Sequence, residues 1–386
     1  MAKLVSLGGA ENWATLLNFL PEGWEDQAKE LGALVRLRRF AGPEELLRTL
    51  LIHLVEGCSL RETAVRAKYG GVAVVSDVAL LKRLKASGEW LRWMAAETMA
   101  AWIEKQPSSV FGSELNLRLI DGTTVEESGS TGSTWRIHYS ICLPSLLCDE
   151  VHVTTPKEGE SFKRFAVHPG DLFMGDRGFA HRNGIEHVVK GGGNVLVRMN
   201  LTSLPVWGPD GNPFPLLSQL RTLSGTKIGD WPVLVSQVET PIPGRICALK
   251  KSKLAAEKAQ RKVVERAGRK GQAIRPETIE SAAYIFVLTT LDSRFTPTAV
   301  LELYRGRWQI ELAFKRLKSV IGLGHLKKTD LEAARAWIHG KLLVAFLIEA
   351  LIVAAERFSP WGYPLRQPQQ KVPLSVERRV IHAPSS

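Results

Sequence analysis

Hydrophobic residues recur at a helical spacing through most of the first hundred positions. In PEELLRTLLIHLVEG, the leucines lie on one face of a helix that starts at Pro43, and Gly57 ends the segment. The next segment, SLRETAVRA, has Ser59 at the expected N-cap and Glu62 at the capping-box position. We expect a helical domain over residues 1–112. Its pattern is typical of a helix-turn-helix DNA-binding domain, but a small packing domain gives the same pattern.

The spacing changes near residue 115. LNLRLID is an apolar run that ends at Asp121, and WRIHYSICL and LLCDEVHVT alternate apolar and polar residues as half-buried strands do. DLFMGD is a brief strand that ends at Asp176, and it is followed by a helix, AHRNGIEHVVKGG, and another strand, NVLVRM. This order predicts a mixed α/β sheet over residues 113–200.

The remaining chain divides into three segments. Residues 201–282 are rich in Pro and Gly and contain short strands such as WPVLVSQVE and RICALK, which predicts a β-rich insertion. The core-strand pattern returns in YIFVLTT, and helical spacing follows, so residues 283–358 are expected to be a second part of the core with a helical C-terminal region. The tail, 359–386, is expected to be loosely ordered.

Positive charge is concentrated in two places. The net charge is +12, and Lys250–Arg275 carries ten Lys and Arg against two Glu, while Leu301–Lys328 carries seven against two. A local excess of this kind favours a nucleic-acid partner, although two solvated helical faces would give the same counts. The first of these segments is expected to be a helix or a mobile loop.

Nothing in the sequence predicts a membrane or secreted protein. The four cysteines form no CxxC pair and have no zinc-like spacing, as expected in a reducing compartment. The apolar run Leu342–Ala355 contains Glu349 and is too short to span a bilayer, so it is expected to be a buried helix. We expect a cytosolic protein with no membrane partner and no small-molecule cofactor.

Two carboxylates stand where predicted strands end. Asp121 is followed by Gly122, and Asp176 is followed by Arg177 and Gly178. Acids at the carboxyl edge of a sheet point into the cleft where ligands commonly bind. Asp-Gly is also a favoured turn pair, so each position alone permits a purely structural interpretation.

A third carboxylate lies in a basic helix, YRGRWQIELAFKRLK. On a helical wheel, Tyr304, Arg307, Glu311 and Lys318 fall within an arc of about 60°. A solvated ion-pair helix more often alternates its charges. Arg and Lys bind phosphate, and a carboxylate beside them can hold a divalent cation. Three converging carboxylates suit two-metal phosphodiester chemistry with Mg²⁺ or Mn²⁺.

In these motifs the chain resembles the DDE transposases of bacterial insertion sequences. Tyr304, Arg307, Glu311 and Lys318 match in full the Y-x2-R-x3-E-x6-K signature of one branch. LIDGTTV and GDRGFAHRNGI are similar to the first and second Asp motifs of that family, in the same order. The resemblance covers roughly residues 40–355.

The resemblance implies an RNase H-like catalytic core, interrupted by a β-rich insertion and preceded by a helical end-recognition domain. It implies that Asp121, Asp176 and Glu311 are catalytic and bind two Mg²⁺ or Mn²⁺ ions. Tyr304, Arg307 and Lys318 would contact the phosphates of the element ends. Less specific DNA contacts are expected from further cations, namely Arg177, Arg305, Lys315 and Arg316.

The implied activity is cut-and-paste transposition. The enzyme would cleave double-stranded DNA at the element ends and join the resulting 3′-OH groups to target DNA. Holding two ends together requires at least a homodimer on DNA, and the place of action would be the bacterial cytosol, on the nucleoid. Two alternatives are a DNA-binding protein that has lost transposition and an RNase H-like nuclease that does not join strands.

Overall fold

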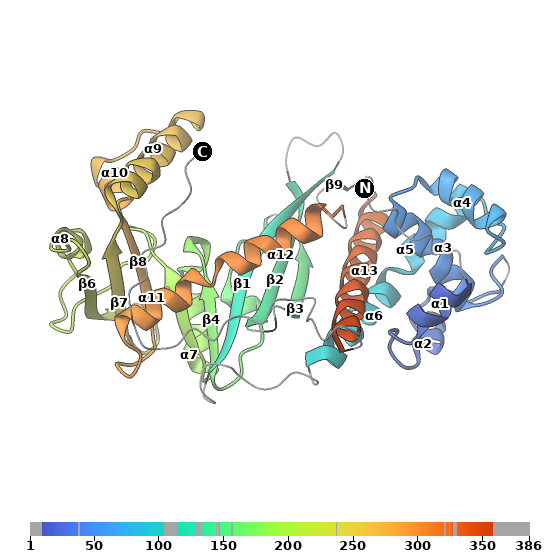
Figure 1. Cartoon of the computed structure of the whole chain (residues 1–386), viewed down its shortest axis with the longest axis horizontal. Helices are drawn as coiled ribbons and strands as arrows, with labels where there is room; N and C mark the ends of the chain where they lie inside the picture. The colour runs from blue at the N-terminus through green and yellow to red at the C-terminus, as the bar shows by residue number, and fades with distance from the viewer. Residues whose placement is uncertain are drawn as a thin grey trace.

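The computed structural model describes most of the chain, namely residues 10–37, 39–103, 115–127, 133–143, 145, 147–155, 157–236, 238–319, 322–323, 325–326 and 330–357. The predicted tail, 359–386, lies outside the described residues. Figure 1 shows an elongated molecule, with a group of helices at one end, a sheet in the middle, and strands β6–β8 with α8–α10 at the other end.

The first hundred residues are helical, as predicted. The helices are α1 (Ala10–Leu17), α2 (Trp24–Glu30), α3 (Pro43–Glu56), α4 (Leu60–Tyr69), α5 (Asp77–Ala86) and α6 (Gly88–Ile103). The predicted boundaries of α3 and α4 are confirmed: Gly57 adopts a left-handed conformation with φ 66° after α3, and the Ser59 hydroxyl accepts a hydrogen bond of 3.1 Å from the amide of Glu62.

The last described helix, α13 (Leu331–Arg357), belongs to the same group. It packs mainly against α6 and also against α3 and α5. A Cβ atom on Gly340 would lie only 2.5 Å from Cδ1 of Leu54, so glycine allows α13 to approach α3 closely. By length and composition Leu331–Ala354 is long and apolar enough to cross a membrane, but 72% of its most apolar window is buried within the protein. It is a core helix, as predicted for Leu342–Ala355, although longer than that apolar run.

One mixed sheet forms the centre of the molecule. Its strand order is β3-β2-β1-β4-β5-β8-β7-β6, and β9 pairs with β1 beyond the β1–β4 pairing. Strands β1 to β3 are antiparallel, whereas β4 and β5 run parallel to β1. This arrangement is consistent with an RNase H-like fold. The strands are β1 (Asn116–Glu127), β2 (Ser133–Leu143), β3 (Cys148–Thr154), β4 (Asp171–Gly175), β5 (Asn194–Arg198), β6 (Ile228–Val235), β7 (Ile242–Lys250), β8 (Tyr284–Thr289) and β9 (His325–Leu326).

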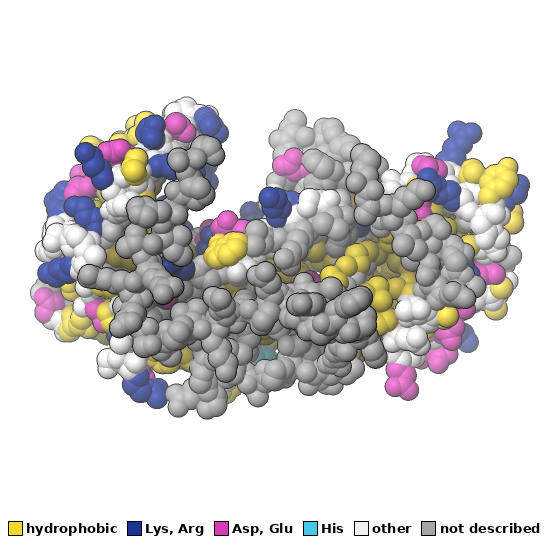
Figure 2. Space-filling model, viewed as in Figure 1, with side chains coloured by type: hydrophobic (Ala, Val, Ile, Leu, Met, Phe, Trp, Pro, Cys, Tyr) yellow, Lys and Arg dark blue, Asp and Glu magenta, His cyan; other side chains and the backbone are white. Residues whose placement is uncertain are grey.

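The segment predicted as a β-rich insertion is less β-rich than expected. It contains β6 and β7, but also α8 (Leu216–Arg221), α9 (Lys253–Arg269) and α10 (Pro276–Ser281). Both strands join the central sheet, because β7 pairs with β8 and β8 pairs with β5. The basic segment is a helix, α9, with no buried residue. Figure 2 shows Lys and Arg side chains gathered on the end of the molecule that contains α8–α10.

Two consecutive helices, α11 (Pro297–Arg305) and α12 (Trp308–Ser319), cross one face of the sheet (Figure 1). The single helix predicted over Tyr304–Lys318 is therefore wrong. At Gly306 the chain tightens: the amides of Gly306 and Arg307 bond to carbonyls three residues earlier, those of Leu303 and Tyr304. The common helical face predicted for Tyr304, Arg307, Glu311 and Lys318 therefore applies only to the two residues within α12, Glu311 and Lys318.

Alternation along the strands defines the two faces of the sheet. Leu119 of β1 and Met174 of β4 belong to the core that contains Ile310 and Phe314 of α12. Ile120 and Phe173 point the other way, into a second core. That second core is covered by two further short elements and α7, namely η1 (Phe162–Arg164), η2 (Arg177–Phe179) and α7 (Arg182–Lys190).

Candidate active site

Asp121 lies inside a strand rather than at its end, which corrects the sequence-based prediction. β1 continues to Glu127 because β2 pairs with it along this whole length, with Tyr139 opposite Asp121. The pairing with β4, however, stops at Leu119 and Met174. Asp121 therefore stands just beyond the carboxyl end of the parallel pair, on the face that α12 covers. The turn interpretation of Asp-Gly is excluded here.

Asp176 directly follows β4, as predicted. It caps η2, and its Oδ1 atom accepts a hydrogen bond of 2.6 Å from the amide of Gly178. By strand alternation it follows Met174 on the α12 face. The two aspartates thus project from neighbouring strands at the same edge of the sheet.

Arg307 connects the first aspartate to the helix. Its Nη1 atom lies 3.3 Å from Oδ2 of Asp121, and its Nη2 atom forms an ion pair with Oε1 of Glu311. The Arg307 side chain is 18% exposed, whereas that of Glu311 is 59% exposed. Arg307 is thus partly buried between the strand and the helix, and Glu311 faces outward from it.

The pKa of Asp121 is raised at this edge, first by burial and then by neighbouring carboxylates. Burial raises the pKa of Asp121 to about 7, and the charges of Asp176 and Glu160 add to this effect. The amide of Gly122, at 2.7 Å, and the Arg307 guanidinium act in the opposite direction. Near neutral pH this carboxyl group can therefore hold or release a proton.

Glu160 was missed by sequence reasoning. It lies after β3 and just before η1, in KEGESF, with no strand end or family motif to mark it. Its carboxylate nevertheless sits beside both aspartates: a Cβ atom on Gly122 would lie 2.9 Å from its Oε1 atom, and one on Gly178 would lie 2.1 Å from its Oε2 atom. Burial and the charge of Asp176 raise its pKa.

Several cationic side chains lie near the carboxylates on the β5 side, namely Arg177, Arg198 and Lys251. Tyr304 is buried, and burial and the charge of Asp176 raise its pKa, while Arg307, Arg198 and Arg177 oppose this shift. Burial, followed by the charges of Arg198 and Arg177, lowers the pKa of Lys251 to about 8. Arg198 and Lys251 come from strand ends that sequence reasoning did not single out, while Arg177 was predicted as a DNA contact.

The other predicted DNA contacts lie further from the carboxylates. Lys315 and Lys318 are exposed on α12, and Lys318 follows Glu311 by about 10 Å along the helix axis. Arg305 is exposed and pairs with Glu302 at 2.9 Å. The side chain of Arg316 lies outside the described part. The structure therefore brings together Asp121, Asp176, Tyr304, Arg307 and Glu311, but not the cations near the end of α12.

The donor atoms at this edge suit a hard divalent cation, because Asp121, Asp176 and Glu160 offer only carboxylate oxygens. As the side chains stand, no group of three or more His, Cys, Asp or Glu in the described residues is arranged to hold a metal ion. The position of Arg307 accounts for part of this, since its guanidinium lies between Asp121 and Glu311.

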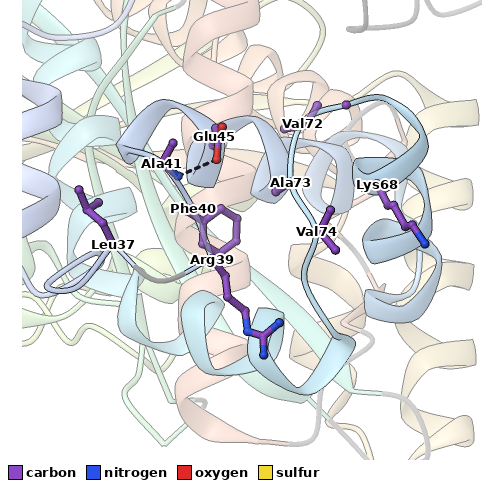
Figure 3. Close-up of a pocket in the computed structure, with 10 residues that line it drawn as sticks. Leu37, Arg39, Phe40, Ala41, Glu45, Lys68, Val72, Ala73 and Val74 are labelled. Carbon is purple, nitrogen blue, oxygen red and sulfur yellow. Dashed lines mark hydrogen bonds between the residues drawn. The ribbon is translucent and has the colours of Figure 1, made fainter.

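A groove elsewhere in the molecule does not belong to this site. It has a volume of about 890 Å³ and is lined by residues around α3 and α4, among them Leu37, Arg39, Phe40 and Val74 (Figure 3). It therefore lies in the N-terminal group of helices, away from the strand ends that carry the aspartates.

Comparison with known proteins identifies the family. A model of the transposase DDE domain matches residues 150–347, which include Asp176 and Glu311. Transposase InsL, named for insertion sequence element IS186A of Escherichia coli (strain K12), is 33% identical over 91% of this chain and 96% of its own length. The transposase for insertion sequence element IS421 of Escherichia coli is 33% identical over the same shares.

A shorter match extends the comparison to a second bacterium. The transposase for insertion sequence element IS1151 of Clostridium perfringens is 35% identical over 68 residues, which are 18% of this chain and 14% of that protein. The two long matches span most of this chain, whereas the short match spans only a small part of it. The chain belongs to the DDE transposases of bacterial insertion sequences, enzymes that cut and transfer DNA strands.

Proposed function

We propose that this enzyme binds the ends of its mobile element, cleaves the phosphodiester bonds there, and joins the 3′-OH ends to target DNA. The observation that carries the proposal is the meeting of Asp121 and Asp176 at one sheet edge, with Glu311 linked to Asp121 through Arg307. Two strands and a helix, distant in sequence, contribute these carboxylates to one place.

Enzymes of this family generally use divalent metal ions, and we propose two ions, Mg²⁺ or Mn²⁺, held by Asp121, Asp176 and Glu311. When bound, such ions supply charge stabilisation to the attacking and leaving oxygens of a phosphodiester exchange. Because the pKa of Asp121 is about 7, part of this carboxyl group is protonated near neutral pH, and it would release that proton to become a ligand. Arg307 would then exchange its two carboxylate partners for a DNA phosphate.

The DNA path follows from the cations around the site. Tyr304 and Arg307 lie beside the carboxylates, and Lys318 extends the contact along α12. Arg177, Arg305, Lys315 and Arg316 are proposed as additional backbone contacts. The exposed cations of α9 would hold a neighbouring stretch of the duplex.

The wider assembly is also a proposal. The N-terminal helices would recognise the element ends, and two copies of the chain would hold two ends together on DNA. In this scheme residues 113–200 and 283–358 form the interrupted RNase H-like core with its helical C-terminal region, in which α13 packs against the N-terminal helices. The enzyme would act in the bacterial cytosol, on the nucleoid.

The site assignment is tested by removing each carboxylate. Asp121→Ala, Asp176→Ala and Glu311→Ala should each abolish Mg²⁺-dependent cleavage of element-end DNA, while affinity for that DNA, measured by fluorescence anisotropy, is retained. Glu302→Ala removes an exposed carboxylate of α11 that pairs only with Arg305 in the described residues, and should leave cleavage intact. Metal-dependent cutting by Glu311→Ala would overturn the assignment.

Joining is tested separately from cutting. With a pre-cleaved element end that carries a free 3′-OH, the wild-type enzyme should insert that end into a target plasmid. Cleavage without insertion would favour a nuclease that does not join strands. Binding without cleavage or insertion would favour a DNA-binding protein that has lost transposition.

A further inference from the structure

The groove among the N-terminal helices is not used by the candidate active site. It has a volume of about 890 Å³, and the residues that line it include Leu37, Arg39 and Val74 (Figure 3). A smaller hollow of about 310 Å³ adjoins it, because Arg39 and Phe40 line both, and this hollow extends to Lys82 on α5. The two hollows together form one surface, the α4–α5 surface.

Apolar side chains project from the α4–α5 surface. Val74 is 66% exposed, although Ala73 and Val75 on either side of it are buried. The two buried neighbours anchor this segment to the core, so that the side chain between them points outward. Val78, in the first turn of α5, is 60% exposed, and Leu37 is 67% exposed. Exposed apolar side chains with polar groups around them commonly mark a binding surface.

Cations surround these apolar side chains. Arg39 and Lys68 line the groove and Lys82 lines the adjoining hollow, and all three are exposed and form no ion pair with the described residues. The carboxylate among these lining residues, Glu45, accepts a hydrogen bond of 2.7 Å from the amide of Ala41. The surface thus has an excess of positive charge. A polyanion complements it, whereas a second copy of the chain would bring like charges together.

Local hydrogen bonds hold the α4–α5 surface in place. The amide of Val72 donates to the carbonyl of Ala67 at 2.9 Å, which fixes the chain as it leaves α4. The hydroxyl of Ser76 accepts a hydrogen bond of 3.3 Å from the amide of Ala79 and caps α5. Arg83 of α5 donates to two backbone carbonyls in the segment before α3. A surface that is already ordered loses little conformational entropy when it binds a partner.

The major groove of double-stranded DNA offers what this surface lacks. It admits a helix such as α5, and thymine presents an apolar methyl group there. The phosphates on either side of the groove are partners for exposed Lys and Arg. The linker between α4 and α5, residues 70–76, is longer than the turn of about three or four residues in a helix-turn-helix, so the inference depends on the side chains and not on that motif.

We propose that the α4–α5 surface recognises bases of the element ends. Val74 and Val78 contact thymine methyl groups in the major groove, while Arg39, Lys68 and Lys82 bind the phosphates beside it. This inference rests on the proposed function, in which the N-terminal helices recognise the element ends, and it names the side chains that distinguish one DNA sequence from another.

The test uses the full chain and two DNA duplexes, with affinity measured by fluorescence anisotropy. One duplex carries the terminal repeat that flanks the gene, and the other has the same bases in scrambled order. The double variant Val74→Ser, Val78→Ser should lower the preference for the repeat by about tenfold or more. Val65→Ser alters an exposed valine of α4 that lines neither hollow, and should keep the wild-type preference. Because all three valines are exposed, the unfolding temperature should not change.

A second measurement changes the DNA in place of the protein. Replacing single thymines of the repeat by uracil removes only a methyl group, and at one or more positions it should weaken binding by the wild type about threefold or more. The same replacements should leave binding by the Val74→Ser, Val78→Ser variant unchanged, because the apolar partner of that methyl group is already absent.

The phosphate contacts are tested with Lys82→Met. This variant should lose affinity for both duplexes by the same factor, and the slope of affinity against salt should fall by about one. Lys29→Met is the matched control, since Lys29 is an exposed lysine of α2 that lines neither hollow, and it should bind like the wild type.

The outcomes separate this inference from the proposed function. If the valine double variant prefers the repeat as strongly as the wild type does, and both cleave it with Mg²⁺, the α4–α5 surface does not recognise bases and the proposed function stands. The inference is equally refuted if that variant changes only the association of the protein in sedimentation, since the surface would then join two copies. If the wild type neither prefers nor cleaves the repeat, both the inference and the proposed function fail.

Discussion

Arg118 of β1 is only 3% exposed, and it is held by three carboxylates. Its guanidinium lies 2.5 Å from Asp149, 2.7 Å from Glu150 and 3.1 Å from Asp171. It also packs over the ring of Phe173. This residue illustrates how the sheet keeps charge in its interior: the ion pairs form a structural network on the face away from α12, and they take no part in the candidate site.

Removing the cation of this network should be costly. Arg118→Met leaves Asp149 and Asp171 buried without their partner, so we expect the free energy of unfolding to fall by about 3–5 kcal/mol. Urea denaturation measures this change. Arg305→Met breaks an exposed pair with Glu302 and should change stability by less than about 1 kcal/mol. Equal effects of the two substitutions would contradict the structural role of Arg118.

We expect Lys251 to make DNA affinity depend on pH by meeting a DNA phosphate. Its pKa of about 8 lies below the ordinary value of 10.5, so the folded protein binds fewer protons than the unfolded chain between these values, and stability rises with pH through that window. A bound phosphate favours the charged form. Above pH 8, affinity should therefore fall with rising pH, by up to about tenfold per unit.

Two substitutions check the role of Lys251, with affinity measured between pH 7 and 9.5. Lys251→Arg keeps its charge and should show a flatter profile than the wild type. Lys251→Met should lower the slope of affinity against salt by about one. Identical pH profiles for wild type and Lys251→Arg would show that this lysine does not meet the DNA.

Individual site residues differed in how well the sequence revealed them. Asp176 and Glu311 stand in short motifs whose spacing carries the chemistry. Glu160, Arg198 and Lys251 carry no such signal, because only the pairing of strands far apart in sequence brings them to the same edge. A local sequence pattern therefore predicts site residues that stand in a recognisable motif. It misses site residues that only the folded sheet brings close to that motif.

At the scale of elements, Gly175 couples β4 to the short helix that follows Asp176. A Cβ atom at this position would lie 2.8 Å from Cβ of Phe179 and 2.9 Å from Cζ of Phe162. These two rings stack with centroids 4.9 Å apart in the second core. The end of β4 therefore approaches the aromatic cluster as closely as backbone permits.

Gly175→Ala should destabilise the protein by about 1–3 kcal/mol through overpacking. Thermal or urea unfolding measures it, and adding Phe162→Leu should recover part of the loss, since the coupling is between atoms in contact. Gly268→Ala in the exposed helix α9 meets nothing within 4 Å and should be neutral or stabilising. The prediction fails if the two glycines behave alike.

The boundaries of β1, α11 and α12 could not be predicted from the spacing of hydrophobic residues alone. Asp121-Gly122 carries a turn signal, yet β2 supplies ladder partners on both sides of it, so the strand continues. The spacing around Tyr304–Lys318 suits one helix, but the chain tightens at Gly306 and starts a second one. The caps at Ser59 and Gly57 were predictable because they depend on residues a few positions away.

At the scale of the whole molecule, the two ends of the described chain fold together. α13 packs against α6, α3 and α5, so the helical group is built from residues near both termini. Sequence reasoning placed the first domain at residues 1–112 and assigned the late helix to the catalytic core. Helical spacing gives the face that a helix buries, but not which distant element covers it.

We therefore expect a fragment of residues 1–112 to lack a stable fold alone. Without α13, the apolar face formed by α3, α5 and α6 would be open to water. Circular dichroism and thermal unfolding would show a loose helical state, and a fusion of the fragment to residues 330–357 should restore a cooperative transition. A cooperative transition of the fragment alone would show that it is an independent domain.

The place of α13 has a consequence for how the protein is made. A ribosome finishes β1, β4 and both aspartates long before it reaches Leu331, the residue at which α13 begins. Until then the N-terminal helices lack their largest packing partner, and Glu311 is among the later residues to emerge. A nascent chain that stops before Glu311 would thus hold neither the full set of carboxylates nor a finished helical group, so the capacity to cut DNA would arise only after α12 and α13 have been made.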